Sequence, residues 1–272
     1  MKDLHIHTKY SDGEYDEYEI LNKIKEAKVT EFAICDHDTL EGSIKIHNLL
    51  KNKTNNLKFH SGVELSCIVH NFKNKNIDVH LLVRDFDYND PIILNFIHEI
   101  SYLRSLKIER MVKLVKEIYN FNISQKDIDE ILKQTNSFGK PHIYQILSKY
   151  NNYDREQFYK NMNKLKSDDL KLDAIKVIQT INKTKGNVTL AHPIEIMEEY
   201  NFTYQDIEKL VNYLKEFGLH GLETMHSKHT QENYEQFAKI ANKFKLNQTQ
   251  GSDYHGPTDK PHVKLGICKK NK

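Results

Sequence analysis

The chain opens with Asp3-Leu4-His5-Ile6-His7-Thr8, and a second stretch of the same kind follows as Phe32-Ala33-Ile34-Cys35-Asp36-His37-Asp38. Each is a short apolar run, typical of a buried strand, that ends in histidine or aspartate. Between the two stretches, apolar residues recur at the spacing of one helix face, namely Ile20, Leu21, Ile24 and Ala27. The beginning of the chain therefore predicts a β-α-β unit.

This alternation continues to about residue 90 and returns later in the chain. We expect a helix over 41–51 and strands near 58–63 and 77–83. After the turn signal at 185–187, we expect strands at 188–191, 221–224 and 246–249, with helices over 204–216 and 231–243. Parallel strands joined by helices, about seven in all, indicate an α/β barrel or a doubly wound sheet. Both architectures gather functional side chains at the C-terminal ends of their strands.

The middle of the chain has a different character, because helical periodicity replaces strand-like runs from about Pro91. Ser124, with Asp127 three residues later, predicts the capped start of one of its helices. We therefore expect an all-helical insert at 99–184, which separates a first part at 1–98 from a second part at 185–272.

Composition excludes several classes of protein. The 272 residues carry 40 basic and 38 acidic side chains, for a net charge of +2, and no long basic run marks a surface for bulk nucleic acid or an anionic membrane. No apolar stretch is long enough for a membrane span, and no export signal is evident. The three cysteines, Cys35, Cys67 and Cys268, are odd in number and scattered, which favours a reducing, cytoplasmic location.

Histidines and acids at the predicted strand ends are the candidate functional residues. His5 and His7 are two apart in a strand, so both imidazoles point to the same face and can share a metal ion. Asp12 follows in a turn, and later strands end in or carry His37, Glu64, His80, His192, Asp253 and His255. Mixed imidazole and carboxylate ligands suit manganese, iron or zinc.

The order of these motifs resembles the PHP (polymerase and histidinol phosphatase) family. The similarity lies in Asp3-Leu4-His5-Ile6-His7-Thr8 with Ser11-Asp12-Gly13, in Ala33-Ile34-Cys35-Asp36-His37-Asp38-Thr39, in Gly62-Val63-Glu64-Leu65-Ser66, in His80, in Ala191-His192-Pro193 and in Gly251-Ser252-Asp253-Tyr254-His255. The resemblance implies a distorted (β/α)7 barrel with the helical domain inserted. It also implies two or three divalent ions (Mn, Fe or Zn), with Glu64 bridging two of them. The implied ligands are His5, His7, Asp12, His37, Glu64, His80, His192, Asp253 and His255.

Within the family, the helical insert is similar to that of bacterial 3′,5′-nucleotide-bisphosphate phosphatases and 5′→3′ exoribonucleases. That subgroup has Gly-Arg-Pro-His in the insert, where this chain has Gly139-Lys140-Pro141-His142. Lysine binds phosphate as a point charge and lacks the bidentate fork of arginine, so the change bears on the choice of substrate.

The resemblance implies hydrolysis of a phosphate ester by a metal-bridged hydroxide, with a nucleotide 3′,5′-bisphosphate or a similar phosphomonoester as substrate. Asp12 and His226 are the expected catalytic residues, and Arg104, Lys140 and His226 are expected to bind the substrate phosphate. The alternatives are a 5′→3′ exoribonuclease on short RNA, a histidinol-phosphate phosphatase and a non-catalytic metal-binding module. The expected partner is a small phosphorylated molecule or short RNA, without a membrane or a stable protein partner.

Overall fold

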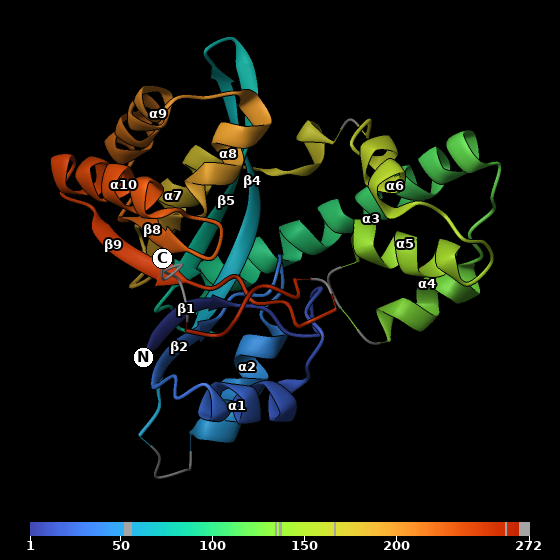
Figure 1. Ribbon diagram of the computed structural model, residues 1–272, viewed down its shortest axis with the longest axis horizontal. Coiled ribbons are helices and arrows are strands. Elements are labelled where there is room, and N and C mark those ends of the chain that lie inside the picture. Colours follow the sequence, from blue (N-terminus) through green and yellow to red (C-terminus); the bar gives the residue numbers. More distant parts are fainter. Residues whose placement is uncertain (52–55, 134, 136–137, 166, 259, 267–272) are drawn as a thin grey trace.

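The computed structural model describes residues 1–51, 56–133, 135, 138–165, 167–258 and 260–266. Cys268 lies outside this part of the chain. A three-stranded parallel sheet contains β1 (Lys2–Ile6), β2 (Glu31–Ile34) and β3 (Lys58–His60). Helices α1 (Glu17–Glu26) and α2 (Glu41–Leu50) pack beside it, below the sheet in Figure 1. The β-α-β start is therefore confirmed.

Helix α1 begins where the sequence places a cap. The Asp16 carboxylate accepts hydrogen bonds from the backbone N–H groups of Tyr18 and Glu19, which would otherwise lack partners in the first turn. The apolar face of α1 then buries Ile20 and Ile24 in one cluster with Phe32 of β2.

A six-stranded sheet forms the larger part of the molecule, in the order β6-β4-β5-β7-β8-β9. Its strands are β4 (Gly62–Phe72), β5 (Lys75–Arg84), β6 (Leu172–Asp173), β7 (Asn187–Leu190), β8 (Gly221–His226) and β9 (Asn247–Gly251). The expectation of parallel strands fails for β5, which pairs antiparallel with both β4 and β7. The reason is a tight hairpin at Lys73 and Asn74, both of which adopt positive φ, at 52° and 61°.

The two sheets meet where the strands end. Isolated bridges join Ile6 to Tyr254 and His37 to Glu64. At the second bridge, the Asp38 N–H donates to the Glu64 carbonyl over 2.8 Å. The fold is thus a mixed α/β structure, and its strand pairing forms two sheets rather than one closed barrel. The bridges bring the C-terminal ends of β1, β2 and β9 beside the beginning of β4.

Four helices cover the larger sheet (Figure 1): α7 (Ala174–Ile181), α8 (Pro193–Tyr200), α9 (Tyr204–Glu216) and α10 (Gln231–Lys243). Their apolar faces share the largest buried cluster with β4, β5, β7 and β8, and Ile178, Leu210 and Phe237 are fully buried in it. In the described ranges, no helix is both long enough and apolar enough to cross a membrane.

A second group of helices extends to one side, on the right of Figure 1. It consists of the long α3 (Pro91–Tyr119), α4 (Gln125–Leu132), α5 (Lys140–Ser148) and α6 (Arg155–Met162), followed by a short 3₁₀ turn at Asp168–Leu170. The predicted cap of α4 is confirmed, since Ser124 Oγ accepts from the Asp127 N–H over 3.1 Å.

Helix α3 belongs to two hydrophobic cores. Its first half buries Phe96 and Ile100 in the main cluster, and its second half buries Met111 and Val115 in a separate cluster with α4, α5 and α6. Strand β6 and helix α7 lie within the range 99–184, yet they pack in the main cluster. The boundaries at 98/99 and 184/185 stay predictions.

Replacement of Gly62 tests the packing where the two sheets meet. A Cβ there would lie 2.5 Å from the Ile34 carbonyl oxygen and 2.9 Å from Cys35 Sγ. We expect Gly62→Ala to lower the free energy of unfolding by about 1–3 kcal/mol, because overpacking forces the backbone apart. Urea denaturation measures this. Gly139→Ala is the control, since its Cβ would meet only Pro141 Cδ at 3.5 Å, and an equal loss in both variants would contradict the prediction.

Candidate metal centre

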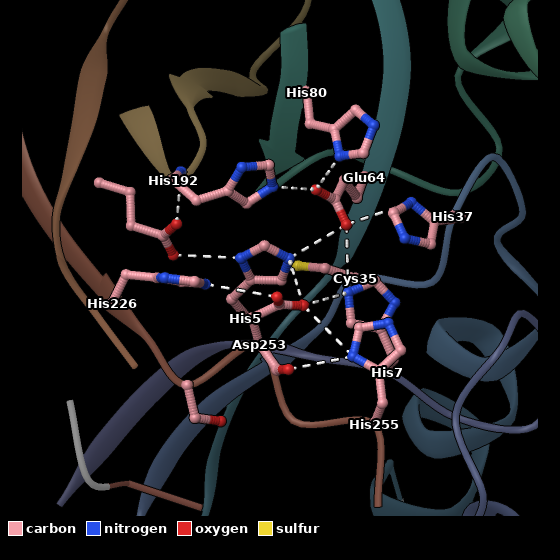
Figure 2. A network of polar contacts seen from close by, with 12 residues as sticks. His5, His7, Cys35, His37, Glu64, His80, His192, His226, Asp253 and His255 are labelled. Atoms are coloured by element: carbon pink, nitrogen blue, oxygen red, sulfur yellow. Dashed lines mark hydrogen bonds and ion pairs between the residues drawn. The ribbon is translucent and has the colours of Figure 1, made fainter. Parts of the chain in front are cut away.

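The carboxylate of Glu64, near the start of β4, lies at the centre of a cluster of imidazoles (Figure 2). Its side chain is only 1% exposed. Three imidazole nitrogens approach Oε2: His5 Nε2 at 3.1 Å, His7 Nε2 at 3.1 Å and His37 Nδ1 at 3.2 Å. Two more approach Oε1: His80 Nδ1 at 2.8 Å and His192 Nε2 at 3.0 Å. One buried carboxylate thus joins side chains from both sheets.

Two further carboxylates extend the cluster. Asp253 Oδ1 lies 3.2 Å from His7 Nε2 and 3.3 Å from His255 Nδ1. Asp12 Oδ1 lies 3.2 Å from His255 Nε2, and its Oδ2 lies 3.7 Å from His37 Nε2. All nine residues predicted as ligands are therefore brought together in one place.

The donor set fits divalent metal ions. Three groups have ligand atoms within 4.8 Å of one another, and they share members: His5, His7, Glu64 and Asp253; His7, Asp12, His37 and His255; His37, Glu64 and His80. Several of their buried atoms, namely His7 Nε2, Asp12 Oδ1 and His37 Nδ1, approach another ligand atom within 3.1–3.2 Å but without the geometry of a hydrogen bond. A cation held between such atoms would satisfy them.

Burial and neighbouring charges set the protonation of the cluster. Burial lowers the pKa of His37 to about 3, so this imidazole is neutral and can ligate at neutral pH. Burial alone would raise the pKa of Glu64, but the imidazoles of His37, His5 and His80 hold it well below the usual value. Burial also opposes protonation of His7, yet Asp253 and Glu64 raise its pKa to about 9. Without metal, His7 is therefore protonated at neutral pH, and a metal ion that binds its ring nitrogen would displace the proton.

The backbone at the cluster is unusually constrained. Asp253 follows β9 with φ at 55°, and Asp38 follows β2 with φ at 54°. Such left-handed conformations in non-glycine residues cluster at functional sites. Gly251 is required for a different reason, because a Cβ there would lie 2.1 Å from the Cβ of His5. The backbone of β9 can therefore approach β1 closely.

Buried carboxylates outside the cluster orient its ligands, and sequence reasoning missed them. Glu223 of β8 is fully buried; its Oε1 accepts from His5 Nδ1 at 3.1 Å, and its Oε2 accepts from the His192 backbone N–H at 2.8 Å. Asp36 accepts from the Thr8 N–H at 2.7 Å and from Ser11 Oγ at 2.6 Å. The only available signal was an acid on a predicted buried strand.

Two lysines, Lys260 and Lys228, contact the cluster or its neighbours, and the sequence did not predict either contact. Lys260 forms an ion pair with Asp253 and, among the lysines and arginines of the described residues, is the one that pairs with a predicted ligand carboxylate. Lys228 pairs with Glu195 at 2.5 Å, and Glu195 Oε2 lies 3.2 Å from His192 Nδ1. Sequence spacing gives no sign of either contact, because both depend on how the loops after β8 and β9 fold back.

The predicted substrate-binding residues lie in different surroundings. Arg104 donates through Nε and Nη2 to Asp38 Oδ2, at 3.0 and 2.5 Å, and through Nη1 to the Phe138 carbonyl at 3.1 Å. Lys140 Nζ donates to Asn163 Oδ1 at 2.6 Å and lines a cavity of about 610 Å³ that Glu195 also lines. Arg104 is thus held by Asp38, the residue after the predicted ligand His37. Lys140 lies on α5 and contacts none of the predicted ligands in the hydrogen bond described above.

His226 joins the cluster from β8. Its Nε2 lies 3.3 Å from Asp253 Oδ2, and its Nδ1 accepts from the Lys228 N–H at 3.2 Å. The side chain is fully buried. Lys107 and Arg110 follow Arg104 on α3, in different surroundings: Arg110 forms a surface ion pair with Asp169, and burial, with Arg104 and Lys171 nearby, lowers the pKa of Lys107 to about 8.

Glu223→Ala tests whether this carboxylate positions the centre. Removal leaves His5 Nδ1 and the His192 N–H without an acceptor, so we expect metal affinity to fall by about 10- to 100-fold. Metal titration by isothermal calorimetry measures this. Glu235→Gln, an exposed change on α10, is the matched control. Unchanged affinity in Glu223→Ala would remove the positioning role.

The stability of the metal-free protein should depend on pH in a defined window. The pKa values of His7 and His192 rise from 6.5 to about 9, so the stability that their protonation provides is complete below about 6.5 and is lost as the pH rises to about 9. The carboxylates of the cluster are ionised throughout this window, because their pKa values are lowered. We therefore expect the melting temperature of chelator-treated protein to fall from pH 6.5 to 9.

Bound metal should weaken this dependence, because it displaces the same protons. Scanning calorimetry with and without manganese makes the comparison. A melting temperature of the chelated protein that rises over the window would contradict the assignment.

Comparison with known proteins supports the geometric description. The PHP domain model matches residues 3–246. A 5'-3' exoribonuclease of Haemophilus influenzae is 28% identical over 261 residues, covering 94% of this chain and 90% of that protein. A phosphoribosyl 1,2-cyclic phosphate 1,2-diphosphodiesterase of Eggerthella lenta is 25% identical over 272 residues, covering 97% of each.

The fold has close structural counterparts as well. A crystal structure from Bifidobacterium adolescentis, described as that of a metal-dependent phosphoesterase, superposes with a TM-score of 0.80 at 23% identity, covering 98% of this chain and 91% of that one. At this identity the likeness concerns the fold alone. The family model spans most of the chain, including Glu64 and the five imidazoles that approach it, and ends before Asp253 and His255. The chain therefore belongs to the PHP domain family and is a metal-dependent phosphoesterase of the hydrolase class.

Proposed function

We propose that the protein hydrolyses a phosphate ester on a nucleotide, with a 3′,5′-bisphosphate or a similar phosphomonoester as substrate. The observation that carries the proposal is the Glu64 carboxylate shared by five imidazoles, with Asp253 and Asp12 beside it. Three overlapping ligand groups support two or three ions, and mixed nitrogen and oxygen donors suit Mn, Fe or Zn. Divalent ions bound there would activate water near neutral pH and neutralise charge on the phosphoryl oxygens.

The exposure of the ligands indicates where substrate enters. The side chains of Asp12, His37 and His80 are 21%, 18% and 28% exposed, whereas Glu64 is 1% exposed. The exposed face of the cluster therefore includes Asp12, His37 and His80, and the phosphate would approach this face. We propose Asp12 as a catalytic residue that touches the reacting group. Full burial of His226 favours the role of holding Asp253 over direct contact with substrate. Arg104 would act through Asp38, and Lys140 would reach a more distant phosphate.

A 5′→3′ exoribonuclease is the second candidate. Curated relatives from Haemophilus influenzae and Escherichia coli carry the name 5'-3' exoribonuclease. A cavity of about 490 Å³ is also lined by Asp12 and His255 and by residues of helices α5 and α6, so a part of the substrate beyond the reacting phosphate could lie beside the centre. The same centre would serve both reactions, because each is hydrolysis of a phosphate ester.

We propose three further assignments that the fold supports. The two sheets, which strand pairing does not close, would be the two parts of a distorted (β/α)7 barrel, joined at the Ile6 and His37 bridges. Residues 99–184 are the insert between 1–98 and 185–272, with its own core in α3 to α6. Cys35 and Cys67 are buried free thiols, in keeping with a reducing cytoplasm.

Phosphate release and oligomer shortening test the proposed function. The panel comprises adenosine 3′,5′-bisphosphate, 5′-phosphorylated short RNA, a phosphoribosyl cyclic phosphate and histidinol phosphate, each with manganese and with chelator. We expect manganese-dependent turnover of the bisphosphate or the RNA. Asp12→Ala and His192→Ala should each lower turnover by about 100-fold or more and reduce bound metal, because each removes a ligand. His47→Ala, on α2 beside Tyr88, is the control. Full activity in both ligand variants would refute the proposal.

A further inference from the structure

The cavity beside the metal centre has two chemically different ends. Its inner end is formed by Asp12 and His255, two members of the ligand cluster. Its outer end is formed by Tyr144 of α5 and by Arg155 and Tyr159 of α6. The volume of about 490 Å³ lies in the range of small-molecule sites and exceeds what a phosphate group alone would fill.

The outer end presents flat groups in fixed positions. The rings of Tyr144 and Tyr159 lie 6.5 Å apart between centroids, and both pack on the fully buried Phe158, at 5.2 and 5.3 Å. Tyr144 Oη donates to the Tyr153 carbonyl over 3.0 Å, which holds its ring in place. The Arg155 guanidinium lies 5.8 Å from the Tyr159 ring centroid.

We propose that this outer end binds the base of the nucleotide whose phosphate lies at the metal centre. This inference rests on the proposed function and adds the part of the substrate that the metal ligands do not contact. Bases of single-stranded nucleic acid stack on tyrosine rings and on guanidinium planes, and such stacking tolerates any base because every base has a π face. Tyr159 and Arg155 therefore act as specificity residues for a base-bearing phosphate ester over a simple sugar phosphate.

Aliphatic or peptide occupants fit this cavity less well. One end is a cluster of metal ligands, which would hold an anionic group through the cations bound there, and the other end is aromatic and cationic. A nucleotide has an anionic group and a flat aromatic group at opposite ends, in the same order.

Matched substrates separate this inference from the proposed function. The first substrate carries a base: it is the bisphosphate or the RNA, whichever the protein hydrolyses in the panel above. The second substrate is the same sugar phosphate without its base. We expect the wild-type kcat/KM to be about tenfold higher with bases, from the size of single stacking contacts. Tyr159→Leu and Arg155→Ala should each raise KM for the base-bearing substrate about five- to tenfold, leave kcat within twofold and leave the base-free substrate unchanged.

Two controls guard against trivial explanations. Tyr102→Leu, at an exposed tyrosine on α3 outside the cavity, should change nothing. Arg155 is exposed at the first position of α6, so its replacement tests the site even if Tyr159→Leu disturbs the helical core. Equal kcat/KM for both substrates in the wild type, or equal loss on both in the variants, would overturn the inference while the proposed function stands.

Direct binding covers the case in which no substrate is turned over, which would count against the proposed function. Calorimetry compares adenosine 5′-monophosphate with ribose 5-phosphate on the manganese-loaded protein. We expect about tenfold tighter binding of the nucleotide, reduced to parity by Arg155→Ala. Equal affinities in the wild type would overturn the base site independently of catalysis.

Discussion

Burial of one carboxylate among five imidazoles is the constraint on which the rest of the molecule depends. Glu64 is removed from water, and imidazole nitrogens of His5, His7, His37, His80 and His192 lie within 3.2 Å of its carboxylate oxygens. An unpaired buried charge costs several kcal/mol, so these side chains must converge for the fold to be stable. They come from both sheets and from loops far apart in sequence. The metal-ligand cluster therefore lies at the junction of the two sheets and is part of the packing that joins them.

Around this centre lies a layer of acids that never reach solvent. Glu223 holds His5 and the His192 backbone, while Asp36 holds Thr8 and Ser11. Each fixes a ring or a turn in one orientation, which lowers the cost of arranging the ligands when a cation binds. The left-handed backbone of Asp253 and the close approach of Gly251 to His5 serve the same end. Left-handed backbone thus lies next to the cluster at Asp38 and Asp253, as it does at turns elsewhere in the chain.

The sequence predicted much of the site and less of the fold. Strand alternation, with histidines and acids at the strand ends, identified candidate residues, because both signals are local. The resemblance to the PHP family then gave the set of nine predicted ligands. The β4–β5 hairpin was missed, since Lys73 and Asn74 adopt positive φ without the Asn-Gly signal that usually marks such a turn. Nothing in the local sequence distinguishes Glu223 from other strand residues, because its role depends on its contact with His5, which is far away in the chain. The pairing of Arg104 with Asp38 likewise depends on how α3 lies across the ends of the strands.

Helix α3 sets a mechanical relation between the two cores that it joins. Its first half is packed against the main sheet and its second half carries α4, α5 and α6, with no loop between the halves. One added residue would rotate the outer helices by about 100° and shift them by about 1.5 Å. The wall that faces Asp12 would then turn away from it. An insertion of about seven residues, two full turns, would restore the orientation of the outer helices but would move them about 10 Å along α3. The length of α3 between the two cores is therefore fixed by the cavity that the outer helices share with Asp12.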